Sequence, residues 1–299
     1  MTASLIPNIS KFDEVFDAEK SSQYRLTIQC ALDGLSYALL DTQSSRLIAL
    51  ECYHSEMLTD SHVLFRTLDQ ALEQKGLNNK AFLSVTCIYD ERINTLIPEP
   101  IFNDADKDKY LEFAFQIPDG YAIHSEKMAS MPCFNVFAMP NTLKEKVLAR
   151  WGNATFTHSS TLFINSVTHD PKQETQVFVN VRSHDFDMVI LKEGHLFFFN
   201  NFKYDTKEDF AYFLLFAMDQ NGLSRQETTV QLSGLILPSS EIIDLCRHYV
   251  KNLIFVDDPH VLQVSDIHRS HQRRRGCERA DTVRRHNQEV WAEPRAERA

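Results

Sequence analysis

The chain has 299 residues, 43% of them hydrophobic and 24% charged, and a formal net charge of −10. This length suffices for two domains, and the acidic balance argues against a general affinity for nucleic-acid backbone, which requires clustered Lys and Arg. No run approaches the roughly 20 apolar residues of a membrane-spanning helix, residues 1–22 lack the pattern of a secretory signal, and six scattered cysteines without a CxxC pair fit reduced thiols in the cytoplasm better than disulfides or a zinc site.

Two-residue alternation predicts three antiparallel strands near the start of the chain, at 24–31, 35–41 and 46–53. Asp33 and Gly34 mark a tight hairpin turn, because both residue types tolerate a positive φ. A helix with one apolar face follows; it is predicted to be capped by Asp60 or Ser61 and ended by Gly76. The next segments are predicted as an apolar strand, a short helix with an acidic first turn and two extended segments, at 81–90, 104–116 and 120–140.

In the middle of the chain, the pattern predicts a helix at 143–151 that is capped by Asn141 or Thr142. A strand at 154–160 and a second helix at 160–167 are predicted to follow. The second half then repeats the order of the first. Three strands are predicted at 175–182, 186–194 and 195–202, followed by a helix, a strand and a Ser-capped helix at 207–221, 228–234 and 239–250.

The order of three strands, a helix and a further strand therefore occurs twice, which is typical of the ribonuclease-H-like module. Two such modules predict an α/β protein of the actin-like ATPase fold, with mixed sheets flanked by helices. The predicted divisions are an N-terminal extension, a first lobe, a second lobe and a tail, at 1–22, 23–140, 141–265 and 266–299.

Four stretches carry a resemblance to a known family: "LDGLSYALLD", "FNVFAMPN", "HSSTLFINS" and the run that begins "VFVNVRSHDFDMVILKEG". Over residues 23–265 the chain is similar to the DUF3822 family, an uncharacterised family of Bacteroidetes proteins with an actin-like fold. The segment between the two modules also resembles the midsection of pilus-assembly and cell-division proteins of the actin superfamily. This resemblance implies ATP and Mg²⁺ in a cleft between the lobes, bound by three loops.

The first of these loops combines an Asp, a Gly and a hydroxyl residue, and Asp33, Gly34 and Ser36 stand near those places. The adjacent Asp and Gly also fit an ordinary hairpin turn. In the second loop, Asn180 takes the place of the Mg²⁺-binding Asp and Arg182 takes the place of the Gly. Asn lacks the charge that Mg²⁺ requires, and the Arg side chain occupies space that a phosphate needs.

Two further acids follow the second loop, Asp185 and Asp187. They are interpreted either as displaced carboxylate ligands or as exposed turn residues. The third loop keeps Ser233 and Gly234 but has Leu235 in place of a second Gly, which crowds a purine.

The low glycine content points the same way. The chain has 8 Gly, none adjacent and none in a GxG pattern, where ordinary usage gives about 21. Loops that surround phosphate with main-chain N–H groups need residues without a Cβ close together. We therefore expect no cofactor, no catalytic residue and no metal site, and the preferred hypothesis is a non-catalytic scaffold that binds an unknown protein partner. The alternative is an ATP-binding protein or weak ATPase with atypical loops.

Three other features bear on function. His184 next to Asp185 is either a catalytic pair or a turn histidine, and the first strand has no carboxylate for two-metal nuclease chemistry. The run "HLFFFNNF" at 195–202 is either core on both faces or a partner-binding face. The tail at 266–299 has nine Arg, six acidic residues and no Lys, which predicts disorder and a frameshifted or foreign C-terminus, or else a weak nucleic-acid contact.

Overall fold

The computed structural model describes residues 6–31, 34–54, 61–168 and 174–255. Its strands are β1 (Ile9–Phe12), β2 (Tyr24–Ala31), β3 (Gly34–Asp41), β4 (Arg46–His54), β5 (Ser84–Asp90), β6 (Asn94–Pro98), β7 (Tyr121–Lys127), β8 (Cys133–Pro140), β9 (Thr155–His158), β10 (Gln176–Val181), β11 (Asp185–Lys192), β12 (His195–Lys203), β13 (Thr229–Gly234) and β14 (Asn252–Phe255). Its helices are α1 (Ser61–Gln74), α2 (Lys107–Glu112), α3 (Asn141–Arg150), α4 (Ser159–Thr168), α5 (Lys207–Gln220) and α6 (Glu241–Arg247).

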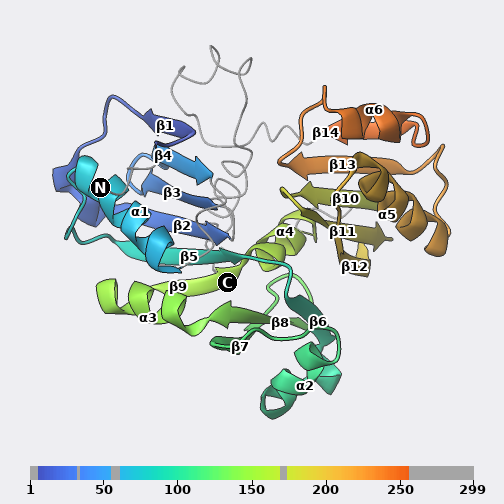
Figure 1. Cartoon of the computed structure of the whole chain (residues 1–299), viewed down its shortest axis with the longest axis horizontal. Helices are drawn as coiled ribbons and strands as arrows, with labels where there is room; N and C mark the ends of the chain where they lie inside the picture. Colours follow the sequence, from blue (N-terminus) through green and yellow to red (C-terminus); the bar gives the residue numbers. More distant parts are fainter. Residues whose placement is uncertain (1–5, 32–33, 55–60, 169–173, 256–299) are drawn as a thin grey trace, which may run out of the picture.

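Two large sheets form two lobes that stand side by side, with a smaller sheet beneath them (Figure 1). The strand order is β1-β4-β3-β2-β5-β9 in the first sheet, β12-β11-β10-β13-β14 in the second and β6-β8-β7 in the third. Apart from β1, the two large sheets have the same order and the same mixture of antiparallel and parallel pairs. Each lobe is therefore one copy of the repeated module that the sequence predicts.

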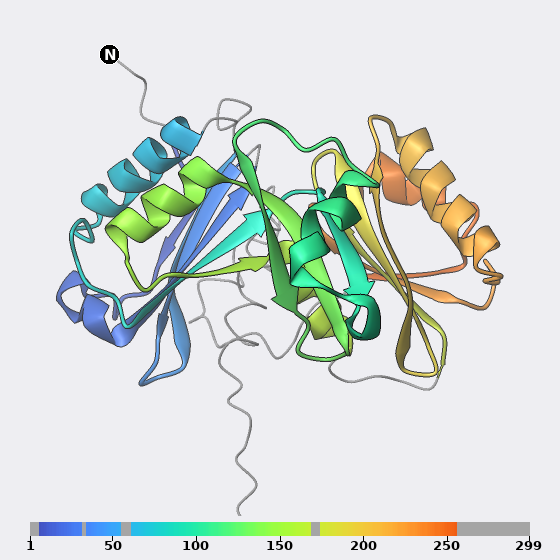
Figure 2. The same cartoon turned by 90° about the horizontal axis from the view of Figure 1, so that it is seen from below.

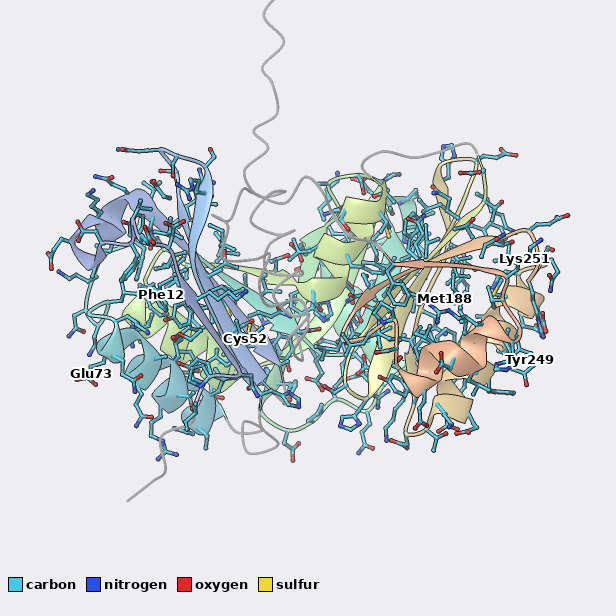
Figure 3. All side chains as sticks on the ribbon, turned by 90° about the horizontal axis from the view of Figure 1, so that it is seen from above. Phe12, Cys52, Glu73, Met188, Tyr249 and Lys251 are labelled. Carbon is cyan, nitrogen blue, oxygen red and sulfur yellow. The ribbon has the colours of Figure 1, made fainter. Side chains whose placement is uncertain are left out.

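Helices cover one face of each large sheet. Helices α1 and α3 lie over the first sheet, and α5 and α6 lie over the second, on the outer sides of the molecule (Figures 1 and 2). Figure 3 shows Cys52 and Met188 inside the two lobes, whereas Glu73 and Lys251 lie at the outer surface. Of the described helices, none has both the length and the apolar character to cross a membrane.

Most predicted strands and helices occur within a few residues of their expected bounds. The structure also has three short strands that the sequence analysis did not predict. Strands β1, β6 and β14 were not predicted, because four or five residues are too few to display a period of two. The predicted caps of α3 are wrong: Pro140 stands at the cap position and makes no side-chain hydrogen bond. The caps proposed for α1 and the interpretations of 266–299 concern residues that lie wholly or partly outside the described ranges.

The boundary between the predicted lobes stays a prediction, but one strand lies on the unexpected side of it. Strand β9 falls within 141–265, yet it pairs in parallel with β5 in the first sheet. The connection between the lobes is then α4, which begins directly after β9.

One buried carboxylate in the first lobe contacts side chains from several elements. Glu51 is 1% exposed, and its oxygens accept hydrogen bonds from the hydroxyls of Tyr37, Tyr53 and Ser10. Lys75 Nζ lies 3.4 Å from Glu51 Oε1. Because a buried charge must be paired and hydrogen-bonded, this cluster joins β1, β3, β4 and the segment that follows α1.

Candidate functional site: a buried ionic cluster between the lobes

The first turn of α4 lies where the three sheets meet. This helix stands between the two lobes (Figure 1), and its first residues are polar and buried. Each hydroxyl contacts a different sheet: Ser159 Oγ donates to Asp90 Oδ1 (2.7 Å) at the end of β5, Ser160 Oγ donates to Asp187 Oδ2 (2.8 Å) in β11, and Thr161 Oγ1 accepts from Asn135 Nδ2 (2.9 Å) in β8. The stretch "HSST" is therefore a junction that joins all three sheets.

Arg182 occupies the centre of this junction. It follows β10 directly and is 8% exposed. Its Nη1 and Nη2 atoms donate to the two carboxylate oxygens of Asp187, both at 2.9 Å, and its Nε donates to Asp185. Nη1 also lies 3.6 Å from Oδ1 of Asp90, which belongs to the first lobe. One guanidinium thus contacts carboxylates from both lobes.

The charges of this cluster are strongly coupled. Burial alone would raise the pKa of the Asp187 carboxyl, but the charge of Arg182 and hydrogen bonds from Arg182, Asn201 and Ser160 offset this and hold the pKa below its ordinary value. Burial likewise disfavours the charged guanidinium, but the neighbouring Asp185 and Asp187 raise the pKa of Arg182. Because three carboxylates surround one guanidinium, the cluster has more formal negative charges than positive ones.

The cluster reaches into the first lobe through Gln29. Gln29 Nε2 donates to Asp90 Oδ2 at 2.8 Å, and Gln29 lies directly opposite Ser36 in the β2–β3 pair. Both residues are fully buried, and among the described residues Gln29 Oε1 and Ser36 Oγ have no hydrogen-bond partner. Ser36 belongs to the predicted first phosphate loop, and Gln29 lies opposite it.

The structure brings together the predicted residues of the second and third loops. Asn180 lies opposite Ser233, and Ser233 Oγ donates to Asn180 Oδ1 at 3.3 Å. Arg182 and Gly234 follow at the ends of the same two strands. Of the first loop, Gly34 and Ser36 lie within β3. Gly34 pairs with Ala31 across β2 and β3, so its expected position in the turn is wrong.

Asp33 lies outside the described residues. Among the described residues, no group of three His, Cys, Asp or Glu side chains could hold a metal ion.

Gly234 has a structural role in this arrangement. Its φ is +91°, and a Cβ built at this position would lie 2.2 Å from the carbonyl oxygen of Val181 and 2.9 Å from Asn180 Oδ1. The same Val181 carbonyl accepts a hydrogen bond from the N–H of Leu235 at 2.6 Å. Close approach of two main chains therefore explains a glycine here.

The interpretation of the two acids after the second loop needs correction. Asp187 is 0% exposed, so its interpretation as an exposed turn acid is wrong. Asp185 Oδ1 accepts from Arg182 and Asn201, which places it in the cluster, whereas His184 is exposed.

Three members of the cluster, Asp90, Ser159 and Ser160, were not singled out from the sequence. The available signals were an acid at the end of an apolar strand and a polar run at the start of an apolar helix.

His158 is a further buried member of the junction. Its Nδ1 accepts from the N–H of Ser160 at 3.1 Å, and the residue is 0% exposed. Burial lowers the pKa of the imidazole to about 4; Asp187 and Asp90 act in the opposite direction, and Arg182 adds to the lowering. His158 is therefore neutral in the folded protein at neutral pH.

Acid is expected to destabilise the protein through His158. In the unfolded chain this imidazole titrates near pH 6.5, so its contribution to stability is complete above pH 6.5 and is lost as the pH falls toward 4. A shift of this size corresponds to about 3 kcal/mol in the free energy of unfolding. Urea unfolding at pH 7 and pH 4.5 should show this loss in the wild type but not in His158→Asn.

The quantity to compare is the change in the free energy of unfolding between pH 7 and pH 4.5, measured for the wild type and for His158→Asn. Groups that titrate alike in both proteins cancel when one change is subtracted from the other. Burial raises the pKa of Glu126 and Glu91, and these carboxyls contribute with the opposite sign in both proteins. His184→Asn, at an exposed position, is the control. An equal acid-induced loss in the wild type and in His158→Asn would show that His158 is not buried in a neutral state.

Comparison with solved structures identifies the class of fold. A Bacteroides thetaiotaomicron VPI-5482 protein with an actin-like ATPase fold and unknown function is 16% identical with a TM-score of 0.73, over 81% of this chain and 94% of that chain. A chain of the PilM–PilN type IV pilus biogenesis complex is 10% identical with a TM-score of 0.52, over 78% of this chain and 88% of that chain. The predicted actin-like ATPase fold is thus confirmed.

The family follows from the sequence match. The model of the family described as "Protein of unknown function (DUF3822)" matches residues 13–253, and the chain belongs to this family. No curated protein matches the chain.

Proposed function

We propose that this chain is a non-catalytic scaffold or protein-interaction module that keeps the actin-like fold without using it to bind nucleotide. The observation that carries this proposal is the position of Arg182. Its guanidinium stands where the second phosphate loop is expected, and it is already paired with Asp187 and Asp185 and lies near Asp90.

The electrostatics of the cluster support this proposal. A nucleotide triphosphate needs converging N–H donors and positive charge, or a metal ion held by free carboxylates. Around Arg182 the donors are engaged, and the surplus charge is negative, which repels phosphate. Asn180 and Ser233 hydrogen-bond to each other, and Gly234 is accounted for by its contact with Val181. The residues present therefore do not fit Mg-ATP.

One observation favours the alternative, an ATP-binding protein or weak ATPase. Within the described part of the chain, Ser36 Oγ of the predicted first loop and Gln29 Oε1 opposite it are buried without a hydrogen-bond partner, and a ligand in the first lobe would supply partners. The match to the PilM–PilN complex supports the scaffold instead, because that fold there belongs to a protein–protein complex.

Thermal unfolding with and without millimolar Mg-ATP or Mg-ADP tests the proposal. A nucleotide at 100 times its Kd would stabilise the fold by about 2.7 kcal/mol and raise the midpoint by a few degrees. We expect no shift with either nucleotide. A shift of several degrees that Ser233→Phe abolishes, and that Ser44→Phe in the exposed turn after β3 does not, would contradict the proposal and favour the alternative.

A further inference from the structure

Strand β12 differs from the other strands of its sheet. It has nine residues, "HLFFFNNFK", of which five are Leu or Phe, and none of the nine is buried. All six residues of β10 and six of the eight in β11 are buried. In the sheet of described strands, β12 stands at one edge and pairs only with β11. Among the described residues it is therefore an apolar strand with one unpaired edge.

Edge strands of this length and composition are uncommon, because proteins blunt their edges with short strands, charges and bulges. Of the other described edge strands, β1, β9 and β14 have four residues each, β6 has five and β7 has seven. A bulge does mark the start of β12, where the register shifts between Ile190 and Leu191. Lys192 Nζ lies 3.6 Å from the centre of the ring of Phe197 there. From Phe198 to Lys203 the register is regular, and this segment is the open part of the edge.

The hydrogen bonds show which main-chain groups face outward. The N–H of Asn201 donates to Oδ1 of Asn200 at 2.9 Å and so does not bond to β11. Because N–H groups alternate along an antiparallel strand, those of Phe199 and Lys203 face the same way as that of Asn201. The outer edge thus presents a row of main-chain donors, one of which is covered by the side chain of Asn200.

An aromatic surface lies beside this edge. Ring centroids are 6.5 Å apart for Phe198 and Phe202, 5.5 Å for Phe202 and Phe213, 5.3 Å for Phe213 and Tyr212, and 5.9 Å for Tyr212 and Phe216. Tyr212 and Phe216 are 60% and 46% exposed on the outer side of α5. A contiguous run of rings therefore leads from the edge strand onto the neighbouring helix, and such rings are enriched at the centres of protein interfaces.

The charges of β12 indicate the occupant. The strand carries one formal charge, that of Lys203 at its end, and no acidic residue. Lys203 Nζ lies 3.8 Å from Oδ1 of Asp205, and both side chains are exposed. A second copy of β12 would bring no carboxylate to Lys203, and the whole chain carries −10, so a second copy is disfavoured. We propose that an extended segment of a partner protein, apolar in its middle and acidic at the end that meets Lys203, adds to the edge of β12 as a further strand.

This inference rests on the proposed function and names its site. The site also has a physical link to the ionic cluster: Asn201, whose N–H faces outward, donates from Nδ2 to Asp187 at 2.9 Å and to Asp185 at 3.2 Å.

The test uses the full chain and a defined probe. The probe is a fluorescent, end-blocked nine-residue peptide with glutamate at both ends and alternating Val and Thr between them. We expect saturable binding by fluorescence anisotropy. Lys203→Pro, which removes one outward N–H and one charge at an exposed edge position, should weaken binding about tenfold. Asn200→Ala, which uncovers the N–H of Asn201, should tighten binding about threefold. Asn153→Ala, at an exposed site elsewhere, should change nothing.

Circular dichroism and the melting midpoint of each variant establish that it is folded. No saturable binding by the wild type, or equal binding by a folded Lys203→Pro variant, would overturn the proposal. A dimer in sedimentation that Lys203→Pro dissociates would also overturn it, since the edge would then bind a second copy. The probe and the nucleotide experiments are independent: a nucleotide-dependent shift with normal probe binding would refute only the proposed scaffold role.

Discussion

Replacing Arg182 with methionine is expected to lower the free energy of unfolding by about 3–5 kcal/mol. Met fills much of the same volume but leaves the carboxylate of Asp187, which is 0% exposed, without its two hydrogen bonds from the guanidinium. Asp90 and Asp185 lose the same neighbour. An uncompensated buried charge costs far more than the net contribution of the pair that it belonged to. Chemical denaturation at pH 7 measures the loss.

A matched control separates this effect from the loss of any arginine. Arg225 pairs with Asp219 at the surface, and Arg225→Met is expected to cost less than about 1 kcal/mol because water screens exposed pairs. Combining Arg182→Met with Asp187→Asn removes the orphaned charge, so we expect the double variant to regain part of the stability lost in Arg182→Met alone. A loss in Arg182→Met no larger than that in Arg225→Met would mean that Arg182 is not buried among carboxylates.

Replacing Gly234 with alanine is expected to cost about 3 kcal/mol or more, for two separable reasons. A φ of +91° is strained for any residue with a Cβ, and this Cβ would overlap the Val181 carbonyl oxygen at 2.2 Å. The main chain of β10 or β13 must then shift. Gly120 has a φ of +80° with nothing within 4 Å of its Cβ position, so Gly120→Ala measures the conformational strain alone, about 1 kcal/mol.

The difference between the two glycine variants isolates the close contact of the strands. If Gly234→Ala and Gly120→Ala lowered the melting midpoint equally, the steric role of Gly234 would be refuted, and a different reason for a glycine in the third loop would be needed. A larger loss in Gly234→Ala shows that this glycine is required without any nucleotide.

Local patterns in the sequence predicted the repeated modules well. The strands β2, β3 and β4 follow from the two-residue alternation, which is a feature of neighbouring residues. The match between the two halves then indicated the fold. Strands β1, β6 and β14 were missed because their pairing partners lie far away in sequence, as in the pairing of β1 with β4, and a short strand carries little signal of its own.

The site was harder to predict, for a physical reason. The expectation that Arg182 fills the second phosphate loop rested on its large, charged side chain, and it stays a prediction. The partners of Arg182 could not be deduced, since Asp90 and Asp187 meet it only through the packing of two lobes around α4. The burial of Asp187 was misjudged because an acid near a turn is usually solvated. The Phe-rich run was expected to be core on both faces or a binding face, and β12 is half-buried on both.

A calorimetric titration of the chain with Mg-ATP tests most directly whether the ionic cluster around Arg182 takes the place of nucleotide. Calorimetry detects binding whether or not the ligand changes the melting midpoint. For the wild type, we predict that the heat of injection shows no saturable binding up to millimolar Mg-ATP. Saturable binding with a micromolar Kd, lost in Ser233→Phe and kept in Ser44→Phe, would show that nucleotide binds despite the ion pairs of Arg182 and would contradict the proposal that this chain is a scaffold with a closed inter-lobe site.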